Sequence, residues 1–118
     1  MEHKIVFNNC YGGFSLSLEA VNWLAEHATD SDLKTYIQLS YRDTDKIYLG
    51  HVIGDWFADK RHHRDLVAVV ETLGSDRASG VCAQLSICYI SGNQYRIEEY
   101  DGAEEVVTPE DSNWIIIE

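Results

Sequence analysis

The feature that most constrains this chain is a glycine turn set between an apolar run and an amphipathic segment. Residues 8–17 read NNCYGGFSLS, with the apolar residues 5–7 before them and a helix-like run over 18–28 after them. Gly12 and Gly13 can adopt a positive φ without steric cost, so the chain can reverse sharply there. The pattern therefore predicts a buried strand, a tight turn and a helix, in that order.

Three interpretations of the turn stay open. A helix N-terminus after a glycine turn offers N–H groups to an anion, which would make the turn a cradle for a nucleotide-like ligand. Cys10 precedes the turn, where the positive end of a helix dipole favours a reactive thiolate. The third interpretation is a plain connection in which Cys10 is mostly buried and reacts slowly. The candidate ligand residues are Cys10, Tyr11, Gly12, Gly13, Ser15, Ser17, Tyr100 and Asp101.

Two segments have the apolar periodicity of amphipathic helices, residues 18–28 and 65–73. Ser15 or Ser17 can cap the first of them, because a serine hydroxyl can accept a hydrogen bond from the first helical turn. Gly74 lies where the second helix is expected to end. Two helices are too few to cover both faces of a parallel sheet, so the sequence indicates an antiparallel arrangement.

Alternating apolar residues and turn signals predict the strands. The most convincing pattern is a hairpin that pairs residues 81–90 with residues 94–100 across Ser91-Gly92-Asn93. Further strands are expected at residues 4–8, 36–41, 46–53 and 114–117. The predicted fold is α+β, a mainly antiparallel sheet of about four or five strands with the two helices packed on it. The core is expected to contain Phe7, Leu24, Leu66, Val69, Val70, Leu85, Ile87 and Ile97.

The chain of 118 residues is long enough for a single domain over residues 1–118 with one core. It has no apolar run near the roughly 20 residues of a membrane helix and no signal-peptide core, so we expect a cytoplasmic protein without membrane contact. Three cysteines without paired spacing, and adjacent His62 and His63 without a CxxC motif, argue against disulfides and a metal site. The glycine spacing fits neither a dinucleotide fingerprint nor a phosphate loop, so no cofactor is expected.

The distribution of charge is the main functional signal. The net charge is −11, and residues 97–118 contain eight acids and no lysine or arginine. Such a surface repels phosphate, so direct nucleic-acid binding is not expected. It suits a partner protein with a basic surface or the imitation of nucleic acid, although it can also serve only to keep a small protein soluble. The candidate partner-binding residues are Glu98, Glu99, Asp101, Glu104, Glu105, Glu110 and Asp111.

The basic residues concentrate instead at residues 60–64, which read KRHHR. Positive charge is unfavourable just before a helix, so Arg61 and Arg64 need another use, and pairing with the acidic C-terminal segment is the plainest one. We expect the acidic segment to form an exposed patch. The double reversal Glu104→Lys/Glu105→Lys is then expected to slow association with a basic partner and to leave the fold intact.

Three blocks of the sequence together resemble a family of small bacteriophage and prophage proteins. They read NNCYGGFSLSLEA at 8–20, DLVAVVETLG at 65–74, and AQLSICYI with YRIEEYDGAEEV within 83–106. No activity accompanies this resemblance, but it implies a phage setting, in which small acidic proteins often act on host machinery.

The expected function is therefore that of an accessory protein that binds a host protein and inhibits a defence or nucleic-acid enzyme. One alternative is a binder of a small, nucleotide-like ligand at the glycine turn. A second is an enzyme that uses Cys10 with His62 or His63, which requires the cysteine and a histidine to converge in space.

Overall fold

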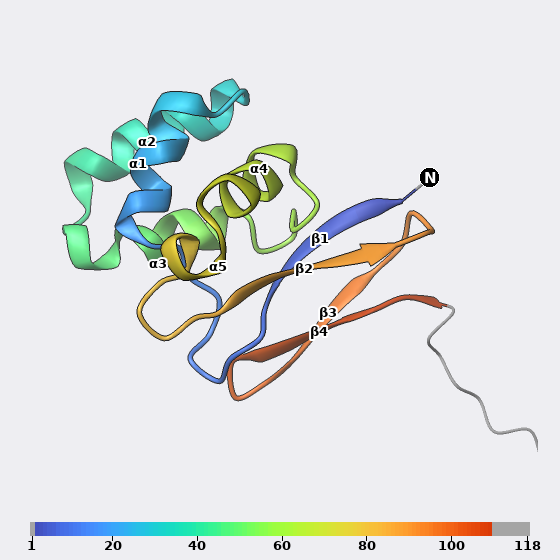
Figure 1. Cartoon of the computed structure of the whole chain (residues 1–118). Coiled ribbons are helices and arrows are strands. Elements are labelled where there is room, and N and C mark those ends of the chain that lie inside the picture. Colours follow the sequence, from blue (N-terminus) through green and yellow to red (C-terminus); the bar gives the residue numbers. More distant parts are fainter. Residues whose placement is uncertain (1, 110–118) are drawn as a thin grey trace, which may run out of the picture.

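The computed structural model describes residues 2–109. Figure 1 shows the helices gathered on one side of the molecule and the strands on the other. The elements are β1 (His3–Asn8), α1 (Leu18–His27), α2 (Ser31–Asp43), α3 (Lys46–Trp56), α4 (Arg64–Leu73), α5 (Ser75–Ala78), β2 (Leu85–Ile90), β3 (Arg96–Tyr100) and β4 (Ala103–Val107). Within residues 2–109 no helix is long and apolar enough to cross a membrane. The strand expected at 114–117, and Glu110 and Asp111, lie outside the described residues.

The chain is α+β, but the prediction of one mainly antiparallel sheet of four or five strands with two helices is wrong. The described strands form two separate two-stranded antiparallel sheets, β1 with β2 and β3 with β4. In the first sheet His3 lies opposite Ile90 and Asn8 lies opposite Leu85. Helices α1 to α5 make up most of the remaining structure, so the helical part is larger than expected.

The predicted hairpin between residues 81–90 and 94–100 does not form, because each of its strands has a different partner. β2 pairs with β1, whereas β3 turns back at once into β4. The turn between β3 and β4 consists of Asp101 and Gly102, with φ angles of 49° and 89°. Two residues with positive φ match the twist of an antiparallel pair, and Asp-Gly is a favoured sequence for such a turn.

Residues 36–41 and 46–53, which were expected to be strands, lie in α2 and α3. The carboxylate of Asp30 caps α2 by accepting hydrogen bonds from two backbone N–H groups of its first turn. The buried residues of α2 are Leu33, Ile37 and Ser40, which follow the three-to-four spacing of a helix. Both α2 and α3 pack against α1 and against each other, so this apolar stripe is covered on the inside of the helical layer.

The predicted helices are confirmed, with ends close to those expected. Ser17 rather than Ser15 caps α1, since its Oγ accepts a hydrogen bond from the N–H of Ala20 at 3.0 Å. Gly74 caps the C-terminus of α4 with a φ of 84°, a conformation that suits glycine. These signals are local in the sequence, which is why the sequence locates them.

The core lies between the helices and the inner residues of β1 and β2. Five of the eight predicted core residues are buried: Leu24, Leu66, Val69, Val70 and Leu85. Ile87 is partly buried and packs against this core. Phe7 and Ile97 are only half-buried and do not belong to it, so their assignment to the core is wrong. In β1 it is Ile5 and Val6 that are fully buried. Ile97 lies in the outlying β3–β4 sheet, away from the helices that close the core.

Candidate functional site

A buried ion pair anchors the β3–β4 hairpin to the rest of the molecule. The guanidinium of Arg61 donates two hydrogen bonds to the carboxylate of Glu104, with N–O distances of 2.6 and 2.8 Å. The two side chains are only 6% and 5% exposed. Glu104 also accepts a hydrogen bond from the backbone N–H of Asn8 at 2.8 Å, and the Arg61 guanidinium lies 3.7 Å from the ring centroid of Phe14. The predicted pairing of Arg61 with the acidic segment is thus confirmed.

The ion pair corrects two expectations about the acidic segment. Glu104 is not part of an exposed patch, because its carboxylate is buried against Arg61. The expectation that Glu104→Lys/Glu105→Lys leaves the fold intact is also wrong, since a lysine at 104 would place two cations together in a buried site. Alternation along a strand shows only that neighbours point to opposite faces. It does not show which face is covered by the rest of the chain.

Asn8 holds the glycine turn against the β3–β4 turn. Its side-chain oxygen accepts a hydrogen bond from the N–H of Gln84, and its amide nitrogen donates to the carbonyl groups of Cys10 and Gly102. Gly12 packs so closely on Cys82 that an added Cβ would lie 1.8 Å from the Cys82 carbonyl oxygen. The turn therefore serves first as a junction where β1, β4 and the segment before β2 meet.

The backbone after the glycine turn is already occupied by contacts within the protein. The N–H of Leu16 donates to the carbonyl of Gly50 at 3.1 Å, and the N–H of Ser17 donates to the carbonyl of Ala78 at 2.9 Å. The Ser17 hydroxyl caps α1 and donates to the carbonyl of Arg77. The backbone N–H groups of Leu16 and Ser17 and the Ser17 hydroxyl, which were expected to bind an anion, therefore donate to backbone carbonyl groups of the same chain.

The candidate ligand residues divide between two separate hollows on the surface. Tyr11 and Tyr100, both largely exposed, border one hollow together with the acids of the β3–β4 hairpin. Ser15 and Ser17 line another, between α1 and α3. Cys10, expected to be mostly buried, is half-buried. The exposed Asp101 forms the β3–β4 turn itself.

The hollow beside Tyr11 and Tyr100 has a volume of about 350 Å³. Glu98 of β3 lies directly opposite Glu105 of β4, and both are exposed. Glu99 is also exposed and borders the same hollow. Arg96 is the one base in these two strands, and its guanidinium donates two hydrogen bonds to Glu98. This hairpin therefore carries an acidic surface with two aromatic side chains at its edge.

The contacts of the two candidate catalytic histidines do not include Cys10. His62 contacts the hydroxyl of Tyr95 at 2.7 Å. One ring nitrogen of His63 accepts from the N–H of Asp65, and the other contacts the carboxylate of Asp30 at 2.9 Å, which holds the pKa of Asp30 below its usual range. Across residues 2–109 no group of three or more histidine, cysteine, aspartate or glutamate side chains is placed to hold a metal ion.

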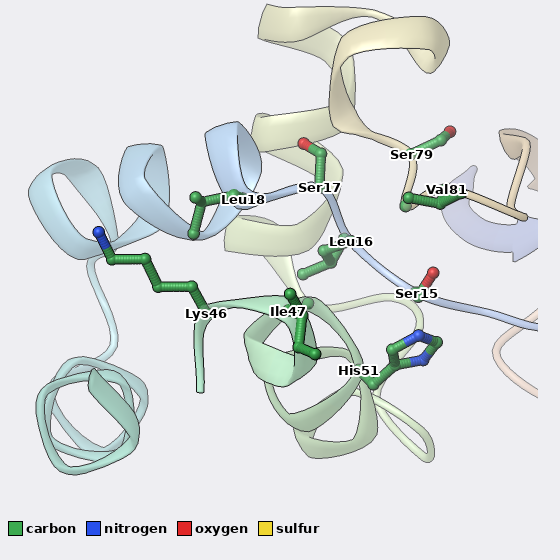
Figure 2. A pocket seen from close by; sticks show the side chains of 11 residues that line it. Ser15, Leu16, Ser17, Leu18, Lys46, Ile47, His51, Ser79 and Val81 are labelled. Carbon is green, nitrogen blue, oxygen red and sulfur yellow. The ribbon is translucent and has the colours of Figure 1, made fainter. Parts of the chain in front are cut away.

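The second hollow is a pocket of about 390 Å³ between α1, α3 and residues 79–81 (Figure 2). Ser15 and Ser17 were predicted as ligand residues from the sequence, but the other residues that line this pocket were missed. Ile47 and His51 line it from α3, one helical turn apart, and Val81 lines it from the other side. The Asp30 cap was the available signal for α2, whereas the sequence pattern predicted two strands, at residues 36–41 and 46–53, in the region of α2 and α3.

Comparisons of the chain with protein-family models, with curated proteins and with solved structures find no match. The resemblance to bacteriophage and prophage proteins therefore stays a prediction.

Proposed function

We propose that this chain is a small acidic accessory protein of the phage type, and that its β3–β4 hairpin binds a host protein with a basic surface. The observation that supports this most directly is that Glu98 lies opposite Glu105 on the exposed face of the hairpin. Like charges directly opposite each other across two strands destabilise the pairing. Arg96 offsets part of this repulsion through its hydrogen bonds to Glu98. Glu99 and Glu105 pair with no base within residues 2–109, so these two exposed acids remain open to a cation from a partner.

The two tyrosines beside the acids favour arginine as the group that binds. Tyr11 and Tyr100 are exposed at the border of the hollow that Glu98 and Glu105 also line. A guanidinium can stack on an aromatic ring and donate paired hydrogen bonds to a carboxylate at the same time, whereas a lysine ammonium acts as a point charge. The surface of the β3–β4 hairpin, which combines exposed tyrosines with acids, is therefore suited to an arginine-rich partner.

Arginine-rich surfaces are typical of proteins that bind nucleic-acid phosphates. We infer that the partner is a host defence or nucleic-acid enzyme in the host cytoplasm, and that the acidic hairpin competes with nucleic acid for its basic surface. The resemblance to phage proteins and the net charge of −11 support this setting.

Charge reversal of the exposed pair tests the proposal. Affinity capture from bacterial lysate with the wild-type chain identifies the partner, and stopped-flow mixing with the purified partner then measures the association rate. The variant Glu98→Lys/Glu105→Lys is expected to associate at least about tenfold more slowly at low salt, because charged surfaces act mainly through electrostatic steering. The difference is expected to shrink at about 0.15 M salt, where the screening length falls to about 8 Å.

The matched control is Asp43→Lys/Asp55→Lys, which changes the net charge by the same amount. Asp43 and Asp55 are exposed near the C-terminal ends of α2 and α3, where lysine is favourable to the helix dipole. This variant is expected to associate at close to the wild-type rate. Equal rates for the hairpin variant and the wild type at low salt would mean that the acidic surface serves solubility alone, and the proposal would fail.

A further inference from the structure

A second site lies beside the segment that follows the glycine turn. It is the pocket of about 390 Å³ between the N-terminus of α1, the first turns of α3 and residues 79–81. This volume falls within the range of small-molecule sites in proteins. In Figure 2, Lys46 lies at one end of the pocket and His51 with Ser15 at the other, and Leu16 and Ile47 lie between them.

The walls of the pocket leave apolar side chains open to solvent. Ile47 is 77% exposed, Val81 is fully exposed and Leu18 is also exposed. All three line the pocket. Scattered apolar side chains on a surface are ordinary, but a group of them around one hollow marks a binding site for an apolar group. The middle of the pocket therefore suits the apolar body of a ligand.

The residues that line the pocket include a lysine, Lys46, and no acid, although the chain as a whole is strongly acidic. Lys46 forms no ion pair within residues 2–109, although it begins α3, where positive charge is unfavourable to the helix dipole. Asp45, the N-cap residue of α3, directly precedes Lys46, and the first turn after it contains no acid. The N-terminus of α1 also borders the pocket, and the carboxylate of Glu19 in its first turn is held by Arg77. The N-terminus of α3 and the lysine therefore favour an anion at this end of the pocket.

A serine hydroxyl that borders the pocket without a hydrogen-bond partner gives independent support. Ser15 is 2% exposed and lines the pocket, yet its hydroxyl makes no hydrogen bond to any described residue. The hydroxyls of Ser17 and Ser79, which line the same pocket, both donate to backbone carbonyls. In Figure 2 the Ser15 oxygen lies between the His51 ring and Val81. The Ser15 oxygen is not among the fully buried side-chain atoms that lack a partner, so it is open to the pocket and free to hydrogen-bond a polar atom of a ligand.

We propose that this pocket binds a small organic anion with an apolar body. The anionic group lies at the Lys46 end, the apolar body covers Leu18, Ile47 and Val81, and a hydrogen-bonding group meets the Ser15 hydroxyl. The site shares Ser15 and Ser17 with the set expected from the glycine turn, but Lys46, Ile47 and Val81 give it its selectivity. It does not depend on the acidic hairpin.

Three related probes test each part of the assignment. The first, 3-(4-hydroxyphenyl)propionate, has an anionic end, an apolar ring and a hydroxyl end. The second, 3-(4-hydroxyphenyl)propan-1-ol, lacks the charge, and the third, 3-phenylpropionate, lacks the phenolic hydroxyl. Titration of the ¹⁵N-labelled chain, followed by amide chemical shifts, is expected to give saturable shifts around the pocket with the first probe. Loss of the charge is expected to weaken binding about tenfold, and loss of the hydroxyl several-fold.

Two neighbouring residues of α3 supply a matched pair of variants. Ile47→Glu places a carboxylate in the pocket and is expected to weaken binding of the first probe by at least about tenfold. Tyr48→Glu adds the same charge at the next position, which is exposed and does not line the pocket, and should change binding less than about twofold. Ser15→Ala is expected to remove the preference for the hydroxyl-bearing probe and to leave binding of 3-phenylpropionate unchanged.

Several outcomes would overturn the assignment. The wild-type chain would show no saturable shift, or the shifts would lie away from the pocket. Equal affinity of the wild-type chain for the first and second probes would show that the pocket does not select an anionic group. Equal weakening by Ile47→Glu and Tyr48→Glu would show that the probe responds to net charge alone.

Discussion

Replacing Glu104 with glutamine is expected to lower the free energy of unfolding by about 3–5 kcal/mol, the usual cost of breaking a buried ion pair from one side. The Arg61 guanidinium would stay buried without a countercharge. The new amide nitrogen would also face a guanidinium N–H, so that two donors meet without an acceptor. Urea denaturation at pH 7 measures the difference.

Glu105→Gln is the matched control, since it makes the same change at the neighbouring exposed position. It is expected to alter the unfolding free energy by less than about 0.5 kcal/mol. The double variant Arg61→Met/Glu104→Leu should recover part of the loss, because apolar side chains can replace a buried pair. Recovery should be incomplete, because the N–H of Asn8 loses its acceptor. Equal losses for the 104 and 105 variants would show that the ion pair does not anchor the hairpin.

This ion pair links the stability of the fold to the proposed function. Glu104 faces Arg61, whereas the adjacent Glu105 is exposed beside Glu98. The buried contact fixes the hairpin, so the exposed acids are held in place before a partner arrives. Less conformational entropy is then lost on binding, which favours affinity.

The sequence predicts those parts of the fold that depend on neighbouring residues. The caps at Ser17 and Gly74 and the stripe of α4 involve contacts within a few positions, so their residue types are diagnostic. The choice of strand partner is different, because β2 pairs with a strand at the other end of the chain. The Asp101-Gly102 dipeptide was the available signal for the true hairpin, and its two-residue length favoured it over Ser91-Gly92-Asn93.

Helix α2 was missed because a short window of its sequence alternates like a strand. The segment from Ile37 to Tyr41 alternates over five positions, but the helical spacing appears only when the window starts at Leu33. The pocket of the second site lies between α1, α3 and residues 79–81, so its position could not follow from any one segment. The acids of the hairpin were identified from composition, but the burial of Glu104 depends on Arg61, which is distant in sequence.

Gly50→Ala is expected to lower the free energy of unfolding by about 4 kcal/mol or more. A Cβ at this position of α3 would lie 1.8 Å from the backbone carbonyl oxygen of Leu16, which cannot rotate away as a side chain could. The segment at Leu16 would have to separate from α3, and the hydrogen bond from the Leu16 N–H to the Gly50 carbonyl would break. Overpacking commonly costs about 1–3 kcal/mol. Leaving buried backbone groups unpaired adds about 1–3 kcal/mol.

Gly54→Ala, one turn later on the same buried side of α3, is the control and is expected to have the opposite sign. A Cβ at Gly54 would lie 3.5 Å from ring atoms of Phe14, an ordinary contact distance. Alanine within a helix is more favourable than glycine by about 0.5–1 kcal/mol, so this variant should be slightly more stable than the wild type. Thermal and urea unfolding of both variants measure the difference. If both alanines stabilise the chain, the close approach of Leu16 to α3 is not a feature of the fold, and the pocket beside it would have a different shape.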